Sequence, residues 1–246
     1  MENTTLSELD MAFFSDGFRL AEENMSNGFN EASILQVVEK TYAYVDSFIE
    51  QFLEHCKAEG SNVDCKKGCG FCCHQSVFMA PYEAFYLYSR YKGEITGNML
   101  QKRIIEKDAV TSHMKVNEFL TYTKPCPFLV DNVCSVYDSR PMACRLFLSK
   151  KVKSCIDERN NPSDFGKYAE LYELPLHIGR MLNEGVSAYF SENGLKPFEW
   201  ILESSLRILM TDNMAMNKWL NGEDIFKPRD IDDDEWKYLK KFDLAE

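Results

Sequence analysis

The chain has 246 residues, of which 45% are hydrophobic and 27% charged, a composition typical of a globular protein with its own core. No apolar run reaches the roughly 20 residues that a membrane-spanning helix needs, and the first residues lack the features of a secretory signal. The formal net charge of −11 argues against charge-driven binding to nucleic acid or to an anionic membrane. We therefore expect a soluble cytoplasmic protein that binds neither.

The first half of the chain contains three predicted helices. Apolar residues recur at three- and four-residue steps from Ser33 to about Cys56, which is the period of an amphipathic helix. Because Cys56 continues this apolar stripe, we expect it in the core and not at a metal. A second helix is predicted from Pro81, since proline suits the first turn, and a third over 99–122.

The segment 124–159 has a different character, because prolines and cysteines interrupt short apolar pieces. Long helices are predicted again over 163–190 and 197–220, and a short one over 232–242, which begins in an acidic run. Four aromatic residues on these C-terminal helices are expected mainly in the core: Phe190, Phe198, Trp200 and Trp219.

These elements predict a mainly α fold, a helical domain around an irregular, metal-stapled cysteine-rich loop segment. We expect a single domain over 1–246, in which 60–160 is the metal-binding region and 162–246 is a C-terminal helical extension. Little or no sheet is expected.

Eight of the nine cysteines lie between residues 65 and 155, which scattered core cysteines would not do. A reducing cytosol disfavours structural disulfides, so clustered cysteines indicate metal binding or redox chemistry. The predicted metal ligands are these eight: Cys65, Cys69, Cys72, Cys73, Cys126, Cys134, Cys144 and Cys155.

The run Cys65–Cys73 has the spacing C-x3-C-x2-C followed at once by a fourth cysteine. Gly68 and Gly70 let the backbone curl so that three thiolates converge on one centre. Adjacent side chains do not easily share one tetrahedral ion, so Cys73 serves a second centre, another edge of a cluster, or a disulfide. Eight thiols suffice for two four-cysteine sites, or for one cluster with four thiols left over.

Four thiolates on a divalent ion leave a local charge of about −2 that needs compensation in a partly buried site. Arg140 and Arg145 flank Cys144, so we expect these two arginines to lie just behind the metal ligands and to balance their charge. His74 adjoins the run and is a less favoured alternative ligand.

The cysteine pattern resembles the bacterial cysteine-cluster proteins of YkgJ type, a family described as zinc- or iron-chelating. The resemblance covers about residues 60–160 and rests on both halves of the pattern in order: Cys65, Cys69, Cys72 and Cys73, then Cys126-Pro-Phe-Leu, Cys134, Tyr137, Arg140-Pro141 and Cys144-Arg145, and less closely Cys155. It implies a chelated metal, and a link of the family to flagellin lysine methylation implies methyl transfer as one option.

Three functions follow from these observations. The leading one is a metal-binding protein with an iron–sulfur or zinc centre in a structural or redox role, with a slight preference for iron–sulfur because histidine is scarce. The second is an S-adenosylmethionine-dependent enzyme, either of the radical type or related to protein lysine methylation, that uses the same cluster. The third is a metal-stapled module that binds a protein partner through its C-terminal helices. No side chain is predicted to be catalytic.

Overall fold

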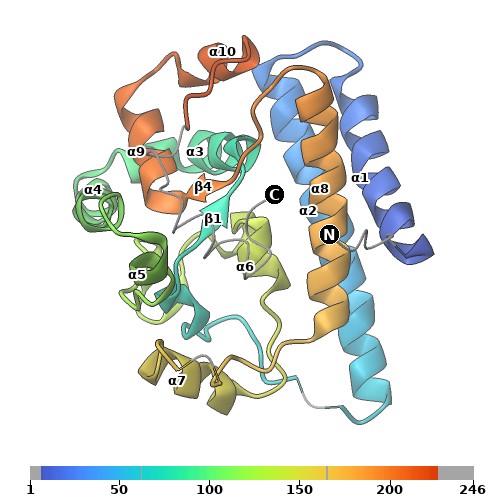
Figure 1. Ribbon diagram of the computed structural model, residues 1–246, viewed down its shortest axis with the longest axis vertical. Helices are drawn as coiled ribbons and strands as arrows, with labels where there is room; N and C mark the ends of the chain where they lie inside the picture. The colour runs from blue at the N-terminus through green and yellow to red at the C-terminus, as the bar shows by residue number, and fades with distance from the viewer. Residues whose placement is uncertain (1–6, 62, 165, 227–246) are drawn as a thin grey trace.

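The computed structural model describes residues 7–61, 63–164 and 166–226, which form a mostly helical structure (Figure 1). The helices are α1 (Glu8–Met25), α2 (Glu31–Ala58), α3 (Pro81–Ile95), α4 (Asn98–Thr111), α5 (Val116–Leu120), α6 (Met142–Leu146), α7 (Val152–Asn160), α8 (Glu173–Glu192), α9 (Leu202–Thr211) and α10 (Ala215–Leu220). Short 3-10 turns occur at η1 (Cys72–His74) and η2 (Tyr137–Ser139). The predicted mainly α fold is confirmed.

Strands are limited to two antiparallel ribbons in the described ranges. Strand β1 (Phe78–Met79) pairs with β4 (Trp200–Ile201), and β2 (Leu129–Val130) pairs with β3 (Val133–Cys134). The first ribbon joins the segment after the cysteine run to the C-terminal helices, and the second carries a cysteine. The expectation of little sheet is therefore met.

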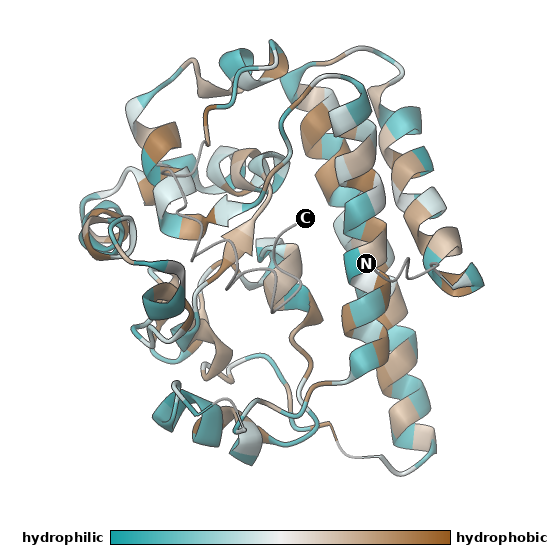
Figure 2. Ribbon diagram, viewed as in Figure 1, coloured by the Kyte–Doolittle hydropathy of each residue, from teal (hydrophilic) through white to brown (hydrophobic). Residues whose placement is uncertain are grey.

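The long helices α1, α2 and α8 run side by side on one flank of the molecule (Figure 1). Each of α1 and α2 begins with a capping residue: Ser7 accepts a hydrogen bond from the backbone N–H of Asp10, and Asn30 accepts one from Ser33. The predicted helix over 33–56 is confirmed as part of α2. Figure 2 shows that these helices alternate apolar and polar residues, as amphipathic helices do.

Helices α1 and α8 approach so closely that glycine is required at the contact. A Cβ atom on Gly17 would lie 1.9 Å from the carbonyl oxygen of Leu182, and one on Gly185 would lie 2.0 Å from that of Phe14. Both neighbours are backbone atoms, so a larger residue would force the helix axes apart.

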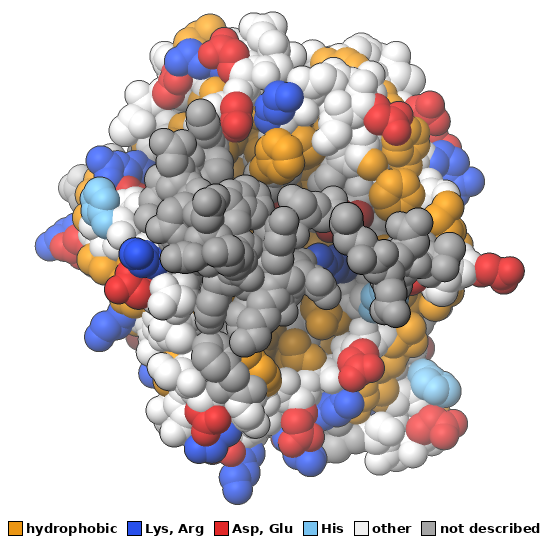
Figure 3. Space-filling model, viewed as in Figure 1, with side chains coloured by type: hydrophobic (Ala, Val, Ile, Leu, Met, Phe, Trp, Pro, Cys, Tyr) orange, Lys and Arg blue, Asp and Glu red, His pale blue; other side chains and the backbone are white. Residues whose placement is uncertain are grey.

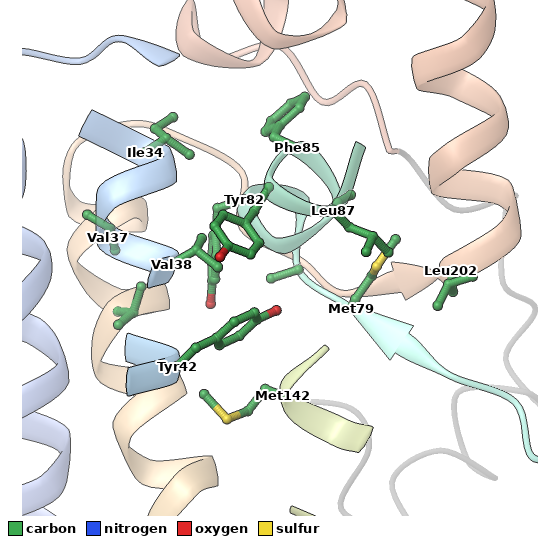
Figure 4. Packing of buried hydrophobic residues seen from close by; sticks show 14 of the residues in the cluster. Ile34, Val37, Val38, Tyr42, Met79, Tyr82, Phe85, Leu87, Met142 and Leu202 are labelled. Carbon is green, nitrogen blue, oxygen red and sulfur yellow. The ribbon is translucent and has the colours of Figure 1, made fainter. Parts of the chain in front are cut away.

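The core lies between this flank and the shorter helices α3, α6, α9 and α10 (Figure 4). Tyr42 on α2 lies near Met142 on α6, and Phe85 on α3 lies above them in this view. The rings of Phe190 and Trp219 contact each other at a centroid distance of 5.5 Å, and both side chains are fully buried. The expectation of a core position is thus confirmed for these two aromatics.

The other two aromatics of the C-terminal segment differ from that expectation. Phe198 is 65% exposed, and Trp200 is partly buried in strand β4. Both belong to the extended chain between α8 and α9, where side chains alternate between the core and the solvent and do not follow a helical stripe.

Two predicted helices are interrupted. The helix predicted over 99–122 is divided into α4 and α5, and the one predicted over 197–220 is divided into β4, α9 and α10. Between α9 and α10, the side chain of Asp212 accepts a hydrogen bond from the backbone N–H of Met214 at 2.9 Å. The same carboxylate forms an ion pair with Lys218 at 2.6 Å. Such local side-chain bonds compete with the helical pattern.

Helix α8 begins at Glu173 and not at the predicted start near Ser163. The preceding residues are extended, because the backbone N–H of Tyr172 donates to the carbonyl of Leu148 at 2.9 Å. This pairing across the chain outweighs the local helical pattern. The helix predicted over 232–242 and its acidic run lie outside the described residues.

None of the helices in the described ranges is both long enough and apolar enough to cross a membrane. Figure 3 shows acidic and basic side chains interspersed over the visible face. The surface drawn there therefore carries mixed charge despite the net charge of −11.

Candidate metal centre

The cysteine run forms a tight irregular loop between α2 and β1. Gly68 has a φ of +92°, a conformation that glycine adopts without steric cost, and the backbone N–H of Cys69 donates to the carbonyl of Lys66 at 3.0 Å. The 3-10 turn η1 then carries Cys72, Cys73 and His74. The loop thus curls back on itself, as the glycines in the sequence predict.

Gly70 packs this loop against the hairpin of β2 and β3. A Cβ atom at Gly70 would lie 3.0 Å from the carbonyl oxygen of Asn132, in the hairpin turn. Asp131 and Asn132 both have positive φ, which is the requirement of a tight two-residue hairpin turn. Glycine and turn together bring Cys134, at the end of β3, towards the run.

The remaining cysteines reach the same region from three other segments. The backbone N–H of Cys126 donates to the carbonyl of Cys73 at 2.7 Å, which ties the second half of the pattern directly to the first. Cys144 is on α6 and Cys155 is on α7. Helix α7 is held beside the run because the backbone N–H of Val152 donates to the carboxylate of Asp64 at 3.0 Å.

We describe the eight thiols as two neighbouring groups, which interact with each other through Cys72. The first thiol group comprises Cys65, Cys69, Cys72 and Cys155: negative charge on Cys69 and Cys72 raises the pKa of both other members, in addition to their burial. The second thiol group comprises Cys73, Cys126, Cys134 and Cys144. After desolvation, negative charge on Cys126, on Cys134 and on Cys72 of the first group raises the pKa of Cys144.

Cys72 lies between the two groups. Its pKa is lowered chiefly by a side-chain hydrogen bond with Cys73, and it interacts electrostatically with Cys134 as well. Cys73 hydrogen-bonds both Cys134 and Cys72, which raises its own pKa. The same bond lowers the pKa of Cys134 to about 7, although desolvation opposes the shift. Cys73 is thus hydrogen-bonded to both of the other two thiols.

Burial raises the pKa of two further thiols, which therefore keep their protons to higher pH. Burial raises the pKa of Cys126 to about 11, and desolvation raises the pKa of Cys144 well above its ordinary value. All nine cysteines carry free thiols. The disulfide considered for Cys73 is therefore not formed.

The donor set suits a metal, although the side chains are not arranged as a finished coordination shell. In the described part of the chain, no three Cys, His, Asp or Glu side chains converge at metal-ligand spacing. Eight free thiols in two adjoining groups nevertheless provide the soft sulfur donors that zinc and iron–sulfur clusters take. Rotation about side-chain bonds would be needed to bring them together.

Arg140 lies beside the thiols. Its positive charge opposes the rise in pKa at Cys144 and contributes to the lowered pKa of Cys72 and Cys134. The guanidinium stacks on the ring of Tyr137 at 3.9 Å from the centroid and donates to that residue's carbonyl. The arginine is thus held in place next to both groups.

Arg145 is directed away from the cysteines and into the protein. It is 3% exposed, stacks on the ring of Tyr42 at 3.9 Å, and forms an ion pair with Asp46 of α2. It also donates hydrogen bonds to the carbonyls of Asp138 and Arg140. Arg145 therefore fixes the segment that carries Cys144 against helix α2.

A buried carboxylate supports the same segment. Glu83 is 2% exposed and accepts three hydrogen bonds, from the hydroxyl of Tyr42 at 2.8 Å and from the backbone N–H groups of Ala80 at 2.9 Å and Met142 at 2.7 Å. Burial raises its pKa, whereas these bonds and the charge of Arg145 oppose the shift. The N-terminal proline of α3 with a glutamate at its third position is a capping signature that could have pointed to this residue.

A buried lysine lies near the second thiol group and was not predicted. Lys107 on α4 is 8% exposed, and its charge opposes the rise in pKa at Cys126. Its Nζ is 3.9 Å from Oε1 of Glu203, a buried atom without a hydrogen bond among the described residues. Lys107 is therefore a buried cation that is paired with Glu203 and also acts electrostatically on Cys126.

The fold and these thiols define a helical protein with a cysteine-rich segment. Residues 64–164 match the model of the CxxCxxCC family, described as "Putative zinc- or iron-chelating domain", and this confirms the resemblance to the cysteine-cluster family. The match covers less than half of the chain, so the helices on either side lie outside it. No curated protein and no solved structure matches the chain.

Proposed function

We propose that this protein chelates metal at two adjoining four-thiolate centres. The first thiol group, with Cys65, Cys69, Cys72 and Cys155, would hold one centre. The second thiol group, with Cys73, Cys126, Cys134 and Cys144, would hold the other. The observation that supports the proposal is the gathering of eight free thiols from separate segments into one region. Within it, Cys65 and Cys73 share only Cys72 among the thiols that most affect their pKa.

Two buried or anchored cations support this assignment. Four thiolates around a divalent ion leave a charge of about −2 at each centre, which is costly away from water. The charge of Arg140, which stacks on Tyr137, acts to lower the pKa of Cys72, Cys134 and Cys144. The charge of Lys107 acts in the same way on Cys126. We assign compensation of the thiolate charge to these two residues, and to Arg145 the positioning of Cys144.

We favour iron–sulfur over zinc, with a redox or structural role. A ligand set without histidine suits clusters, and closely spaced thiolates on a glycine-containing loop are typical of them. Backbone N–H groups also reach the sulfurs, from Val136 to Cys134 and from Phe128 to Cys126. Such N–H···S bonds tune the reduction potential of a cluster.

The enzyme alternative has less support. A radical S-adenosylmethionine enzyme would be expected to place its cysteines within repeated strand and helix units, whereas the described residues form helices and two antiparallel ribbons. The interaction-module alternative rests on fewer residues than predicted, because Phe190 and Trp219 are in the core and only Phe198 of the four aromatics is largely exposed.

Anaerobic purification followed by metal and sulfide analysis and an absorption spectrum tests the proposal. We expect a brown protein with iron and acid-labile sulfide in equal amounts. A colourless protein with about two zinc ions per chain would keep the two centres and reject the clusters. A protein that binds neither metal tightly would contradict the proposed function.

A further inference from the structure

A cavity of about 230 Å³ lies beside the cysteine run, and its wall is formed by residues at the ends of α5 and α7 and in the segments that follow them. Its wall includes His74, which directly follows Cys73, and Glu158 and Arg159 near the end of the helix that carries Cys155. The volume is below the roughly 300–1,000 Å³ of sites for drug-sized ligands. The cavity therefore suits a small molecule.

Most charges around the cavity are already compensated. The carboxylate of Glu158 accepts hydrogen bonds from the side-chain amide of Gln75 and from the backbone N–H of Ala169. Lys167 forms an ion pair with Asp164 at 3.0 Å. Neither pair needs a ligand.

Arg159 is the exception. Its guanidinium lies 5.9 Å from the ring centroid of Phe71, a residue of the cysteine run, and the side chain is only partly exposed. Among the residues that the structure describes, no carboxylate lies within ion-pair distance of it. A half-buried guanidinium on a cavity wall, without a carboxylate partner, is a site for an anion.

His74 adds a hydrogen-bond acceptor to the same wall. The ring is buried, and its Nδ1 lies 3.1 Å from the carbonyl oxygen of Gly70. Since a carbonyl only accepts, Nδ1 is the donor of this bond, and in the neutral ring Nε2 is then an acceptor. His74 and Arg159 are close enough to interact electrostatically. Leu120, Tyr122 and Pro162 supply apolar surface around them.

We propose that this cavity binds a small organic carboxylate. The carboxylate would accept two parallel hydrogen bonds from Arg159, the body would pack on Tyr122 and Pro162, and a hydroxyl or N–H group would donate to His74. A phosphate dianion fits less well, because Arg159 supplies only one positive charge and the carboxylates of Glu158 and Asp164 line the same cavity. The proposal does not depend on the proposed function, since none of these residues is a proposed metal ligand.

The test is a titration of the metal-loaded full chain with 4-hydroxybenzoate and, as a neutral isostere, 4-hydroxybenzamide, followed by two-dimensional NMR. We expect the carboxylate to bind about tenfold more tightly than the amide or better, and Arg159→Gln to remove most of that advantage. Arg159→Lys should keep part of it, which allows for a glutamine variant that does not fold. Lys167→Gln is the matched control, because Lys167 lines the same cavity but is paired, and its effect should stay within about twofold.

Equal affinity for the two compounds would overturn the proposal, as would no binding of either at millimolar concentration. Equal losses in Arg159→Gln and Lys167→Gln would also overturn it. Metal content is measured on the same samples, so a chain that lacks metal but still binds 4-hydroxybenzoate through Arg159 would contradict only the proposed function.

Discussion

Replacement of Glu83 by alanine is expected to lower the free energy of unfolding by about 3–5 kcal/mol. The change removes the acceptor for three buried hydrogen bonds, from Tyr42, Ala80 and Met142, and leaves a cavity between α2, α3 and α6. It also leaves the buried charge of Arg145 with one anion fewer nearby. Urea denaturation, monitored by circular dichroism, measures the effect.

Two further variants serve as controls for the Glu83→Ala measurement. Glu94→Ala removes an exposed glutamate from the same helix and should change stability by no more than about 0.5 kcal/mol. Glu83→Gln keeps the size and most of the hydrogen bonds, so its loss should be smaller than that of the alanine variant. Equal stability of Glu83→Ala and Glu94→Ala would show that the network does not hold α6 in place.

Alanine at Gly17 should also destabilise the protein, by about 3 kcal/mol. The added Cβ would fall 1.9 Å from the carbonyl oxygen of Leu182, so α1 and α8 would have to separate along their contact. Gly93→Ala is the matched control, because Gly93 is on α3 and a Cβ there meets nothing within 4 Å. That variant should gain about 0.5–1 kcal/mol from the higher helix propensity of alanine.

Thermal and chemical unfolding of both glycine variants gives the comparison. If Gly17→Ala were as stable as Gly93→Ala, the close approach of the two helices would be wrong. Gly185→Ala, about one helical turn along the same contact, should resemble Gly17→Ala, because its Cβ would lie 2.0 Å from the backbone of Phe14.

The local sequence pattern was sufficient to predict part of the fold. The apolar period predicted α2, and proline at Pro81 marked the start of α3, because both signals are confined to neighbouring residues. The late start of α8 could not be predicted, since it depends on pairing between Tyr172 and Leu148, which are distant in the sequence. The division of the C-terminal helix likewise depends on the ion pair of Asp212.

In the candidate site too, local features could be predicted from the sequence and contacts between distant segments could not. Spacing and glycines predicted the curled run, because the signal lies in neighbouring residues. The assignment of Cys73 and Cys65 to different centres stays a prediction. The opposite placements of Arg140 and Arg145 could not be predicted, because both flank Cys144 and only the contact of Arg145 with α2 distinguishes them. Lys107 reaches Cys126 from another helix, beyond any local motif.

The proposal that the eight cysteines form two metal centres is tested most directly by metal analysis of single cysteine variants. Cys155→Ser should lose the first centre and Cys134→Ser the second, so each should retain about half of the metal of the unchanged chain. The double variant should retain almost none. Cys56→Ser should retain all of it, because Cys56 is buried on α2 apart from both groups. Full metal content in both single variants, or complete loss in either, would contradict the two-centre account.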